Sequence, residues 1–395
     1  SAQSKSKSLL TLPFFDDFSR GDSNPAPENW SDSYVIINQT YAINPPTIGV
    51  ATFDAINQKG ELYENLSSSS SIMDTLTSQP INLDYPEKDS LYLSFQYQPK
   101  GLGEAPDPND SLVVEFFSVG NSNWIRAWSA SANFLDSTVR EKYILSKKIV
   151  TQKATSIANH FFNVMLPITS DQFMKEGFKF RFMNYASLPS NTQVPSIRGN
   201  GDHWHIDLVY LNRARNYVDS LPNDVGFTKP LSSLLKNYQS IPWKHFVSEA
   251  KQAELTDPLT LNIQYSNLGP DKWDITRRFI ITDLSNLNAP YPASGGSYPI
   301  LAYRTEEYIR DYEYDFLSNW EDSAKYSLES YLITNSPEKY LRWNDTIRYT
   351  QQFINYYAYD DGSAENGYGI FGEGSDNGRV AVKYHSYLPD SLNQI

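Results

Sequence analysis

The chain has 395 residues, of which 46 are acidic and 33 are basic, so its formal net charge at pH 7 is −13. This charge would repel the phosphate backbone of nucleic acids, and we expect no nucleic-acid partner. The sequence contains no cysteine, which excludes disulfides, thiolate metal sites and a cysteine nucleophile.

The composition favours strands over helices. Aromatic residues make up 14% of the chain, mainly as 28 Tyr and 20 Phe, and these residues suit pleated, half-buried strands. No stretch approaches the ~20 apolar residues of a membrane-spanning helix, so we expect a chain that does not span the membrane. The start, SAQSKSKS, has no apolar signal core, which predicts that any signal peptide is already removed or was never included.

The first half of the chain predicts a disordered leader over residues 1–13 and a jelly-roll sandwich of the MAM or concanavalin-like kind over 14–215. One short helix is predicted at 170–176. Apolar and polar residues alternate within several short runs, which is typical of strands with one buried face. These runs are SLYLSFQY at 90–97, SLVVEFF at 111–117 and GFKFRFM at 177–183.

Residues 216–256 predict a helical connector, with helices at 230–238 and 242–254 that each begin at a proline. An immunoglobulin-like sandwich is expected over 257–357 because the strand pattern resumes there. Its predicted strands are 259–265, 275–282, 325–333 and 346–357.

The last segment, 358–395, is too short to bury a core of its own. We expect it to be a partial β segment or the start of a second jelly roll. Either the natural chain continues beyond Ile395, or this end packs against what precedes it. The predicted fold class is therefore all-β throughout, with a short helical connector.

The run 201–211 (GDHWHIDLVYL) is the sharpest local feature. Alternate residues of a strand face the same way, so His203, His205 and Asp207 share one face and the apolar residues between them share the other. Two histidines and a carboxylate can hold zinc or iron. Residues i and i+4 of a straight strand lie about 13 Å apart, however, so the three cannot all reach one ion. A polar outer face over an apolar inner face is the favoured interpretation.

Carboxylates are predicted to meet where the first and last strands of this sandwich pair. Asp16 and Asp17 lie in the first strand region, and Asp207 lies in the last. Their oxygens are ligands that calcium prefers, although calcium takes about six to eight oxygens and only three residues are nominated. The alternative is that Asp16 and Asp17 only begin a strand by accepting turn hydrogen bonds.

No catalytic motif is present, and we expect no enzyme. The sequence lacks G-x-S-x-G and H-E-x-x-H. Paired carboxylates of a glycosidase are defined by their separation in space, which a sequence does not give. The acidic, glycine-rich loop at 359–378 lacks the spacing of an EF-hand and the lysine of a phosphate loop, so a structural turn is the better interpretation.

A tripeptide of Asp, then Ser or Thr, then a small or apolar residue recurs along the chain, against roughly two occurrences expected from average residue usage. One interpretation is that the Asp ends a turn and the apolar residue starts a strand. The other is attachment of O-linked glycans. The hydroxyl residues of these tripeptides are Thr75, Ser90, Ser111, Ser137, Ser220, Ser323, Thr346 and Ser391.

Several runs resemble the N-terminal jelly-roll domain of large exported Bacteroidota proteins that are linked to type IX secretion and gliding motility. They are FFDDFS at 14–19, Trp30, PTIGVATFDAIN at 46–57, TLTSQPINL at 75–83, GFKFRFMN at 177–184 and GDHWHID at 201–207. The run NDTIRYTQQFINYYAYDDGSAENGYG at 344–369 resembles the segment that joins an immunoglobulin-like domain to a second jelly roll in such proteins.

This resemblance implies an exported protein of the periplasm or cell surface, peripheral to the outer membrane. It implies O-glycosylation at the tripeptides, since the tripeptide is that phylum's glycosylation motif, and a structural calcium held by Asp17 and Asp207. The implied partner is an outer-membrane protein of the secretion or gliding apparatus. The C-terminal sorting domain of secreted cargo is absent from the sequence, which leaves either a missing C-terminus or a resident, plug-type subunit.

The main functional prediction is therefore a non-enzymatic component or cargo of the type IX secretion and gliding system that works through protein contacts. The alternative is a carbohydrate-binding jelly roll with a glycan ligand. It needs exposed aromatic residues on a sheet face, for which Trp124, Trp128 and Tyr97 are candidates, although such residues are more often buried in a core. A glycosidase or peptidase is the third hypothesis.

Overall fold

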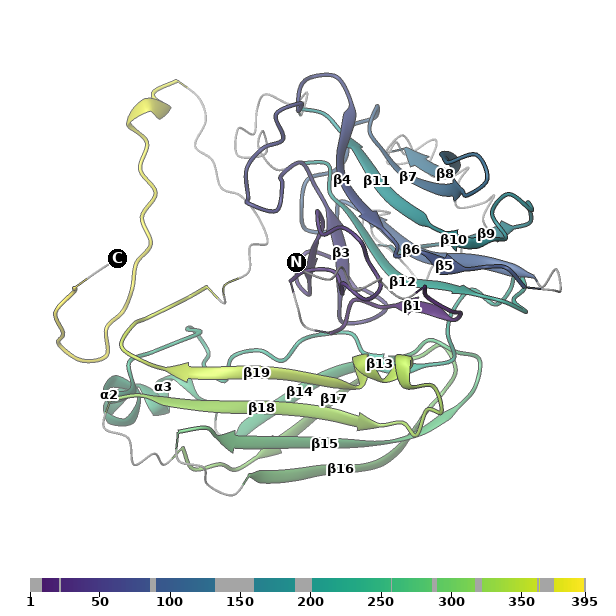
Figure 1. Cartoon of the computed structure of the whole chain (residues 1–395). Coiled ribbons are helices and arrows are strands. Elements are labelled where there is room, and N and C mark those ends of the chain that lie inside the picture. The colour runs from purple at the N-terminus through teal and green to yellow at the C-terminus, as the bar shows by residue number, and fades with distance from the viewer. Residues whose placement is uncertain are drawn as a thin grey trace, which may run out of the picture. The chain divides into compact units, whose positions relative to one another are not determined.

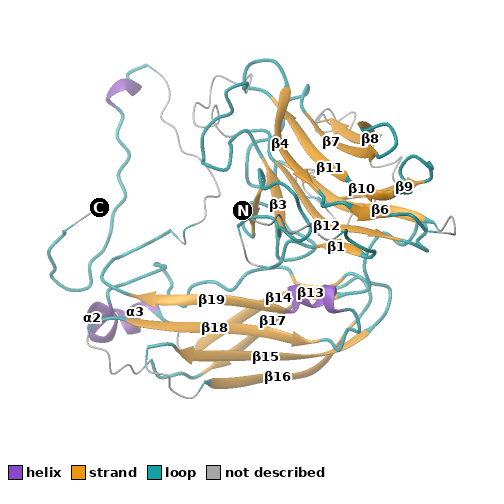
Figure 2. Ribbon diagram, viewed as in Figure 1, coloured by secondary structure: helices purple, strands orange, loops and turns teal. Residues whose placement is uncertain are grey.

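The structure is a computed structural model. It is nearly all β, as expected, and the helices among its described residues are short (Figure 2). The chain divides into an N-terminal unit, residues 1–221 with 364–376, and a C-terminal unit, residues 222–363 with 377–395. The described residues are 9–20, 23–85, 90–131, 160–188, 201–256, 258–285, 290–316, 322–360, 362 and 373–393.

Two main antiparallel sheets form the N-terminal unit (Figure 1). The first is six-stranded, with the order β2 (Ile36–Asn38), β3 (Val50–Phe53), β12 (Trp204–Asn212), β6 (Leu91–Pro99) and β9 (Phe162–Ile168), while β1 (Phe14–Asp16) also pairs with β12. The second is four-stranded, with the order β4 (Ser71–Thr77), β11 (Phe180–Ala186), β7 (Ser111–Ser118) and β8 (Asn123–Ser131). The short strands β5 (Ile81–Asn82) and β10 (Glu176–Phe178) pair with each other. The first and last strands are neighbours, as the sequence predicted for a jelly roll.

Aromatic side chains fill the space between these two sheets. On β11, Phe180 and Phe182 are fully buried, while Arg181 between them is only partly covered, which is the expected alternation of a half-buried strand. Phe182 meets Phe95 of β6 at 4.9 Å between ring centroids, edge to face. Trp30 is 1% exposed and packs against Phe180 at 5.8 Å. The core therefore joins the two sheets through interlocked rings.

The C-terminal unit is a sandwich of three strands on four. One sheet has the order β13 (Val225–Phe227), β14 (Leu259–Asn267) and β17 (Thr305–Tyr312). The other has the order β16 (Tyr291–Ile300), β15 (Trp273–Asp283), β18 (Ala324–Ile333) and β19 (Thr346–Phe353). This arrangement fits the immunoglobulin-like sandwich predicted from the sequence.

One helical segment accompanies this sandwich. It runs through α2 (Trp243–His245), a π-helical stretch (Phe246–Ala250) and α3 (Lys251–Glu254), close to the prediction of a helix at 242–254. Two single 3₁₀ segments complete the helices of the described residues, at Lys339–Asp345 and Ser375–Asn377. None of the helices among the described residues has the length and apolar character to cross a membrane.

Two predicted helices are wrong. Residues 171–175 form turns and bends before β10, and residues 230–238 contain no helix. In the second segment the polar groups bond to neighbouring elements: Leu234 N–H donates to the Gln351 side chain on β19 at 2.9 Å, and Lys236 N–H donates to the Glu254 carbonyl at 2.8 Å. These partners replace the i to i−4 bonds that a helix would make.

The two ends of the chain also differ from expectation. Residues 1–8 of the predicted leader lie outside the described part, but Leu10 forms a parallel bridge with Ile81, so the end of that segment is ordered. A partial β segment or the start of a second jelly roll was expected in 358–395, and the described residues 373–393 contain no strand. Tyr384 instead stacks on Tyr359 at 4.8 Å, within the C-terminal unit.

Candidate functional site

The structure brings two of the nominated acids together. Asp17 follows β1 directly, Asp207 lies on β12, and the two strands pair with Asp16 opposite Val209. Thr47 lies between the two acids, because its hydroxyl contacts the Asp17 carbonyl at 3.1 Å and an Asp207 carboxylate oxygen at 2.9 Å. Both acidic side chains are completely buried.

One oxygen of this pair has no partner. Asp17 Oδ1 accepts hydrogen bonds from the Ser19 hydroxyl at 2.6 Å and the Ser19 amide at 3.1 Å, whereas Asp17 Oδ2 is buried and unbonded among the described residues. Burial raises the pKa of Asp17 to about 6, and burial together with the nearby charge of Asp17 raises the pKa of Asp207 well above its usual range. An ionised buried carboxylate needs a partner, and a cation beside Oδ2 would supply one.

The backbone at this pair is held in unusual conformations. Phe18 and Leu208, each directly after one of the acids, have φ values of 55° and 52°, a left-handed region that costs non-glycine residues energy. A Cβ atom added at Gly49 would lie 1.9 Å from the Phe18 carbonyl oxygen, so the chain after Thr47 presses against this turn. We refer to Asp17, Thr47 and Asp207 as the acid pair site.

The ligand chemistry of the acid pair site suits calcium better than zinc. All of its side-chain ligand atoms are oxygens, which calcium prefers. No cluster of three or more His, Cys, Asp or Glu that could hold a metal occurs in the described ranges, so two carboxylates would need help from backbone oxygens and water. The third nominee, Asp16, is used otherwise, since its Oδ2 accepts from Trp30 Nε1 at 2.7 Å and its Oδ1 from the Phe18 amide at 3.0 Å.

The favoured interpretation of the two histidines is wrong. They do not form an outer face, because His203 is 3% exposed and His205 is 0% exposed. His205 Nδ1 contacts the Thr52 hydroxyl at 2.8 Å, and its Nε2 contacts the Lys100 carbonyl at 3.1 Å, so both ring nitrogens are occupied within the protein. Burial lowers the pKa of His203 to about 4 and that of His205 to about 3, which keeps both rings neutral at pH 7.

Both histidine rings support the loop that follows β6. A Cβ atom at Gly101, which has a φ of 58°, would lie 2.5 Å from His205 Nε2, and one at Gly103 would lie 2.5 Å from His203 Cγ. The Glu104 amide donates to His203 Nδ1 at 3.0 Å. The glycines therefore allow the loop to lie flat on the two rings, which is a structural role for the motif.

A second pair of buried acids closes the same loop. Asp202 accepts hydrogen bonds from the Asp107 amide at 2.8 Å and the Ser187 amide at 3.0 Å, and the Ser187 hydroxyl donates to Asp110 at 2.7 Å. Burial, followed by the neighbouring charge of Asp110, raises the pKa of Asp202 to about 8. The sequence did not single out this pair, because its members are far apart in the chain.

Aromatic and cationic side chains gather on the outer face of the second sheet. Arg181 lies over the ring of Trp124 at 4.3 Å, and Lys179 lies over the ring of Phe117 at 4.5 Å. Arg181 also forms an ion pair with Glu115, with Nε at 2.9 Å and Nη2 at 2.6 Å from the same carboxylate oxygen. We call these five residues the aromatic face.

The other two aromatic candidates do not lie on this face. Tyr97 is 1% exposed and belongs to the core, where its ring packs against Phe162 at 5.3 Å. Trp128 turns inward against Phe95 at 5.2 Å. Of the three nominated aromatic residues, only Trp124 is on the outer face. The sequence missed Phe117, Lys179 and Arg181, although they occupy the outward positions of the alternating strands.

The glycosylation candidates lie in different surroundings. Ser90 and Ser391 are exposed, whereas Thr75, Ser111, Ser220, Ser323 and Thr346 are partly covered, and Ser137 lies outside the described residues. The acid of the tripeptide is buried at Asp74, Asp110 and Asp345, where it has structural contacts. O-glycosylation stays a prediction.

No protein-family model matches the chain, and no curated protein sequence matches it. Among solved structures, the chain shows 8% identity and a TM-score of 0.30 to a GH2 β-galacturonidase from Eisenbergiella tayi, over 87% of this chain and 43% of that one. It shows 10% identity and a TM-score of 0.26 to β-glucuronidase 2 from Bacteroides uniformis, over 86% of this chain and 28% of that one. It shows 9% identity and a TM-score of 0.25 to the CBM22 tandem domain of Paenibacillus barcinonensis Xyn10C, over 87% of this chain and 97% of that one.

These likenesses are too weak to support an argument about fold or function. All three have TM-scores of 0.30 or below and identities of 10% or below. The chain also spans less than half of the length of the two glycosidases. The function is therefore inferred from the geometry of the described residues.

The second acid pair predicts how stability changes with pH. Asp202 binds its proton more tightly in the folded state, with a pKa of about 8, than in the unfolded state, where the usual value is 3.8. Its contribution therefore lowers the free energy of unfolding as pH rises from about 4 to about 8, and is constant above that. We expect Asp202→Asn to reduce this fall in denaturant titrations between pH 5 and 9.

The change in the free energy of unfolding with pH is the quantity to compare between variants. Its absolute value is less informative, because Asn alters one hydrogen bond at every pH. Asn also tolerates the left-handed backbone at this position, where φ is 59°. Asp84→Asn is a matched control at an exposed acid of the same unit and should keep the wild-type slope. Equal slopes for Asp202→Asn and the wild type would contradict the assignment.

Proposed function

We propose that the N-terminal unit is a carbohydrate-binding sandwich and that the aromatic face is its binding surface. The observation that carries the proposal is Trp124, a partly exposed indole on the outside of β8 with Arg181 held against its ring. The inward-facing residues of the same strands are enough to explain the fold. The fold does not require two cations and a carboxylate among aromatic rings on the outer face.

The chemistry of this face suits a sugar ring. The apolar C–H surface of a sugar packs on aromatic rings such as Trp124 and Phe117, while its hydroxyls need fixed donors and acceptors. Arg181 and Glu115 supply both, and their ion pair restrains the two side chains before any ligand arrives. Restrained side chains lose less entropy on binding, which favours affinity.

The proposal includes a structural calcium at the acid pair site. Asp17 and Asp207 would hold it, since Asp17 Oδ2 is buried and unbonded and Asp207 is buried beside it. A cation there would neutralise two buried carboxylates and so stabilise the junction of β1 and β12. This is a role in stability and requires no part in ligand binding.

A place in the type IX secretion or gliding apparatus is a second proposal, and it is supported by the sequence runs that resemble exported Bacteroidota proteins. Absence of enzyme activity likewise stays a prediction. Isolation of the native protein from envelope fractions should recover an outer-membrane protein with it. Recovery of the protein alone, without any envelope partner, in repeated cross-linked preparations would contradict this proposal.

Substitutions in the aromatic face should weaken carbohydrate binding. We expect Trp124→Ala and Arg181→Ala each to weaken glycan binding by about 5- to 30-fold, because each removes a contact worth about 1–2 kcal/mol. Glycan arrays identify the ligand, and calorimetry then measures the affinity. Tyr217→Ala, at a residue that is 67% exposed on the same unit, is the control and should bind as the wild type does. Wild-type protein that binds no glycan on the array would sink the proposal.

Calcium should raise the thermal stability of the N-terminal unit. At a calcium concentration 100 times the dissociation constant, binding would add about 2.7 kcal/mol to the free energy of unfolding. We expect the unfolding midpoint to rise on moving from chelator to calcium in the wild type and in Asp84→Asn. The rise should vanish in Asp17→Asn and Asp207→Asn. Identical midpoints of the wild type in chelator and calcium would exclude the site.

A further inference from the structure

Arg277 is a buried cation in the C-terminal unit. It lies on β15 between Ile275 and Phe279, whose side chains face the space between the two sheets, and it is only 8% exposed. Transfer of a guanidinium from water into such surroundings is costly unless a carboxylate or another anion accompanies it. The position therefore raises the question of what compensates the charge.

The contacts of Arg277 are all neutral. Nη2 donates to the Gly295 carbonyl at 2.8 Å, and Nη1 donates to the Tyr265 hydroxyl at 3.3 Å. The rings of Tyr308 and Tyr298 lie 4.0 and 4.9 Å from its Cζ. These groups satisfy some of its five N–H donors and stabilise the cation partly, but none of them carries a negative charge.

No carboxylate of a described residue lies within 4.0 Å of the nitrogens of Arg277, and its Nε is buried without a hydrogen-bond partner. The buried Arg215 differs in this respect, since it pairs with Asp219. Arg277 thus combines a buried charge, an unused donor and no counter-ion. That combination points to a ligand rather than to a completed internal contact.

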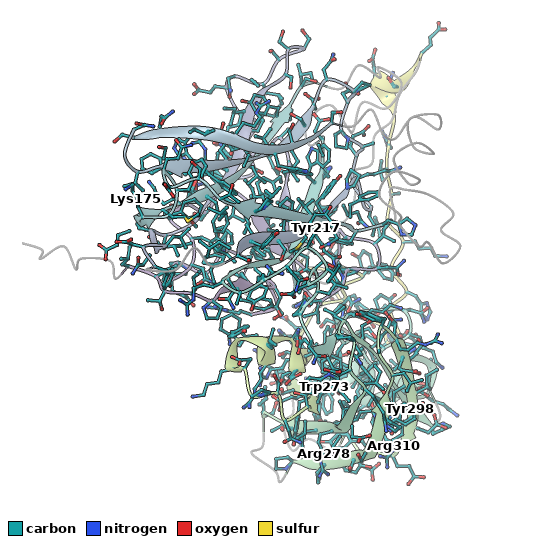
Figure 3. All side chains as sticks on the ribbon, turned by 90° about the vertical axis from the view of Figure 1, so that its right-hand side faces the viewer. Lys175, Tyr217, Trp273, Arg278, Tyr298 and Arg310 are labelled. Atoms are coloured by element: carbon teal, nitrogen blue, oxygen red, sulfur yellow. The ribbon has the colours of Figure 1, made fainter. Side chains whose placement is uncertain are left out.

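A small pocket lies beside this arginine. It is open at the edge of the sandwich, and Figure 3 shows Arg278, Arg310 and Tyr298 near one another on the C-terminal unit. Arg277 and Arg310 both lie on the side of their strands that faces the other sheet, and an anion in this pocket would relieve their mutual repulsion. The lining includes Arg277, Arg278, Gly295, Tyr308, Arg310 and Tyr312.

The backbone of β16 is shaped to complete the pocket. Arg277 pairs with Gly296 and Arg278 with Ser294, so Gly295 is the extra residue of a β-bulge. A Cβ atom at Gly295 would lie 2.9 Å from the Tyr308 hydroxyl and 3.0 Å from Arg277 Cβ. A larger residue would displace the tyrosine ring that lies against the guanidinium.

We propose that this pocket binds the carboxylate group of a small ligand, with Arg277 as its main contact. Two rings already lie against the guanidinium, so we infer that a carboxylate approaches in the plane of the guanidinium, where it forms charge-assisted hydrogen bonds. Arg310, whose Nη1 donates to the Ser294 carbonyl, stands at the same pocket and adds positive charge. The proposal concerns the C-terminal unit and does not depend on the aromatic face.

Calorimetric titration of the full chain with D-glucuronate and with N-acetylglutamate tests the proposal, and glucose serves as the neutral probe. We expect a Kd of about 1 mM for a carboxylate, typical of one desolvated charge contact, and no binding of glucose to this pocket. Binding of both acids would show that the carboxylate alone is recognised. Binding of only one acid would identify which kind of molecule supplies the carboxylate, and it would still support the site.

Two variants assign any binding to the pocket. Arg277→Met keeps the bulk of the side chain and should weaken carboxylate binding at least tenfold, while Arg348→Met, which removes a largely exposed arginine of the same unit, should leave it unchanged. Gly295→Ala keeps the charges of Arg277 and Arg310 and should weaken binding severalfold by displacing Tyr308, so it tests the pocket even if Arg277→Met fails to fold. The proposal is overturned if the wild type binds neither acid, or if Arg277→Met and Gly295→Ala bind them as the wild type does.

Discussion

Strand β12 is buried on both of its faces, and much of the N-terminal unit is arranged around this constraint. Its apolar residues, such as Trp204 and Ile206, enter the core, while His203, His205 and Asp207 are also removed from solvent. Each polar group on the second face therefore needs a partner from another segment. The loop after β6, the turn after β1 and the chain around Thr47 supply these partners, so burial of one strand positions three distant segments.

Buried charge is handled in several ways within the one chain. The two histidines stay neutral because burial lowers their pKa values, and Asp202 keeps its proton until about pH 8. Asp17 and Arg277 each retain an unbonded polar atom in the interior. A protonation change is a small adjustment for histidine and aspartate, but arginine cannot lose its proton in this way. Asp17 and Arg277 are therefore where ligands of opposite sign are proposed.

The two faces of the second sheet separate stability from recognition. Phe180 and Phe182 point inward and interlock with the first sheet, whereas Arg181 between them points outward to Trp124 and Glu115. A strand with a period of two places adjacent residues in different environments. The same short segment can therefore hold the core together and present a polar, aromatic surface, and substitutions at neighbouring positions should affect different properties.

The β architecture and most strand positions followed from the sequence, because alternation and turn residues are local signals. The pairing of the first and last strands was expected from the jelly-roll interpretation. The sequence also nominated Asp17 and Asp207 through that pairing. It did not show that His203 and His205 are buried, or that residues 230–238 bond to Gln351 and Glu254 instead of forming a helix. Nor did it show that Arg277 has no counter-ion among the described residues. Those outcomes depend on which distant groups surround a residue, and only the tertiary structure decides burial and partners.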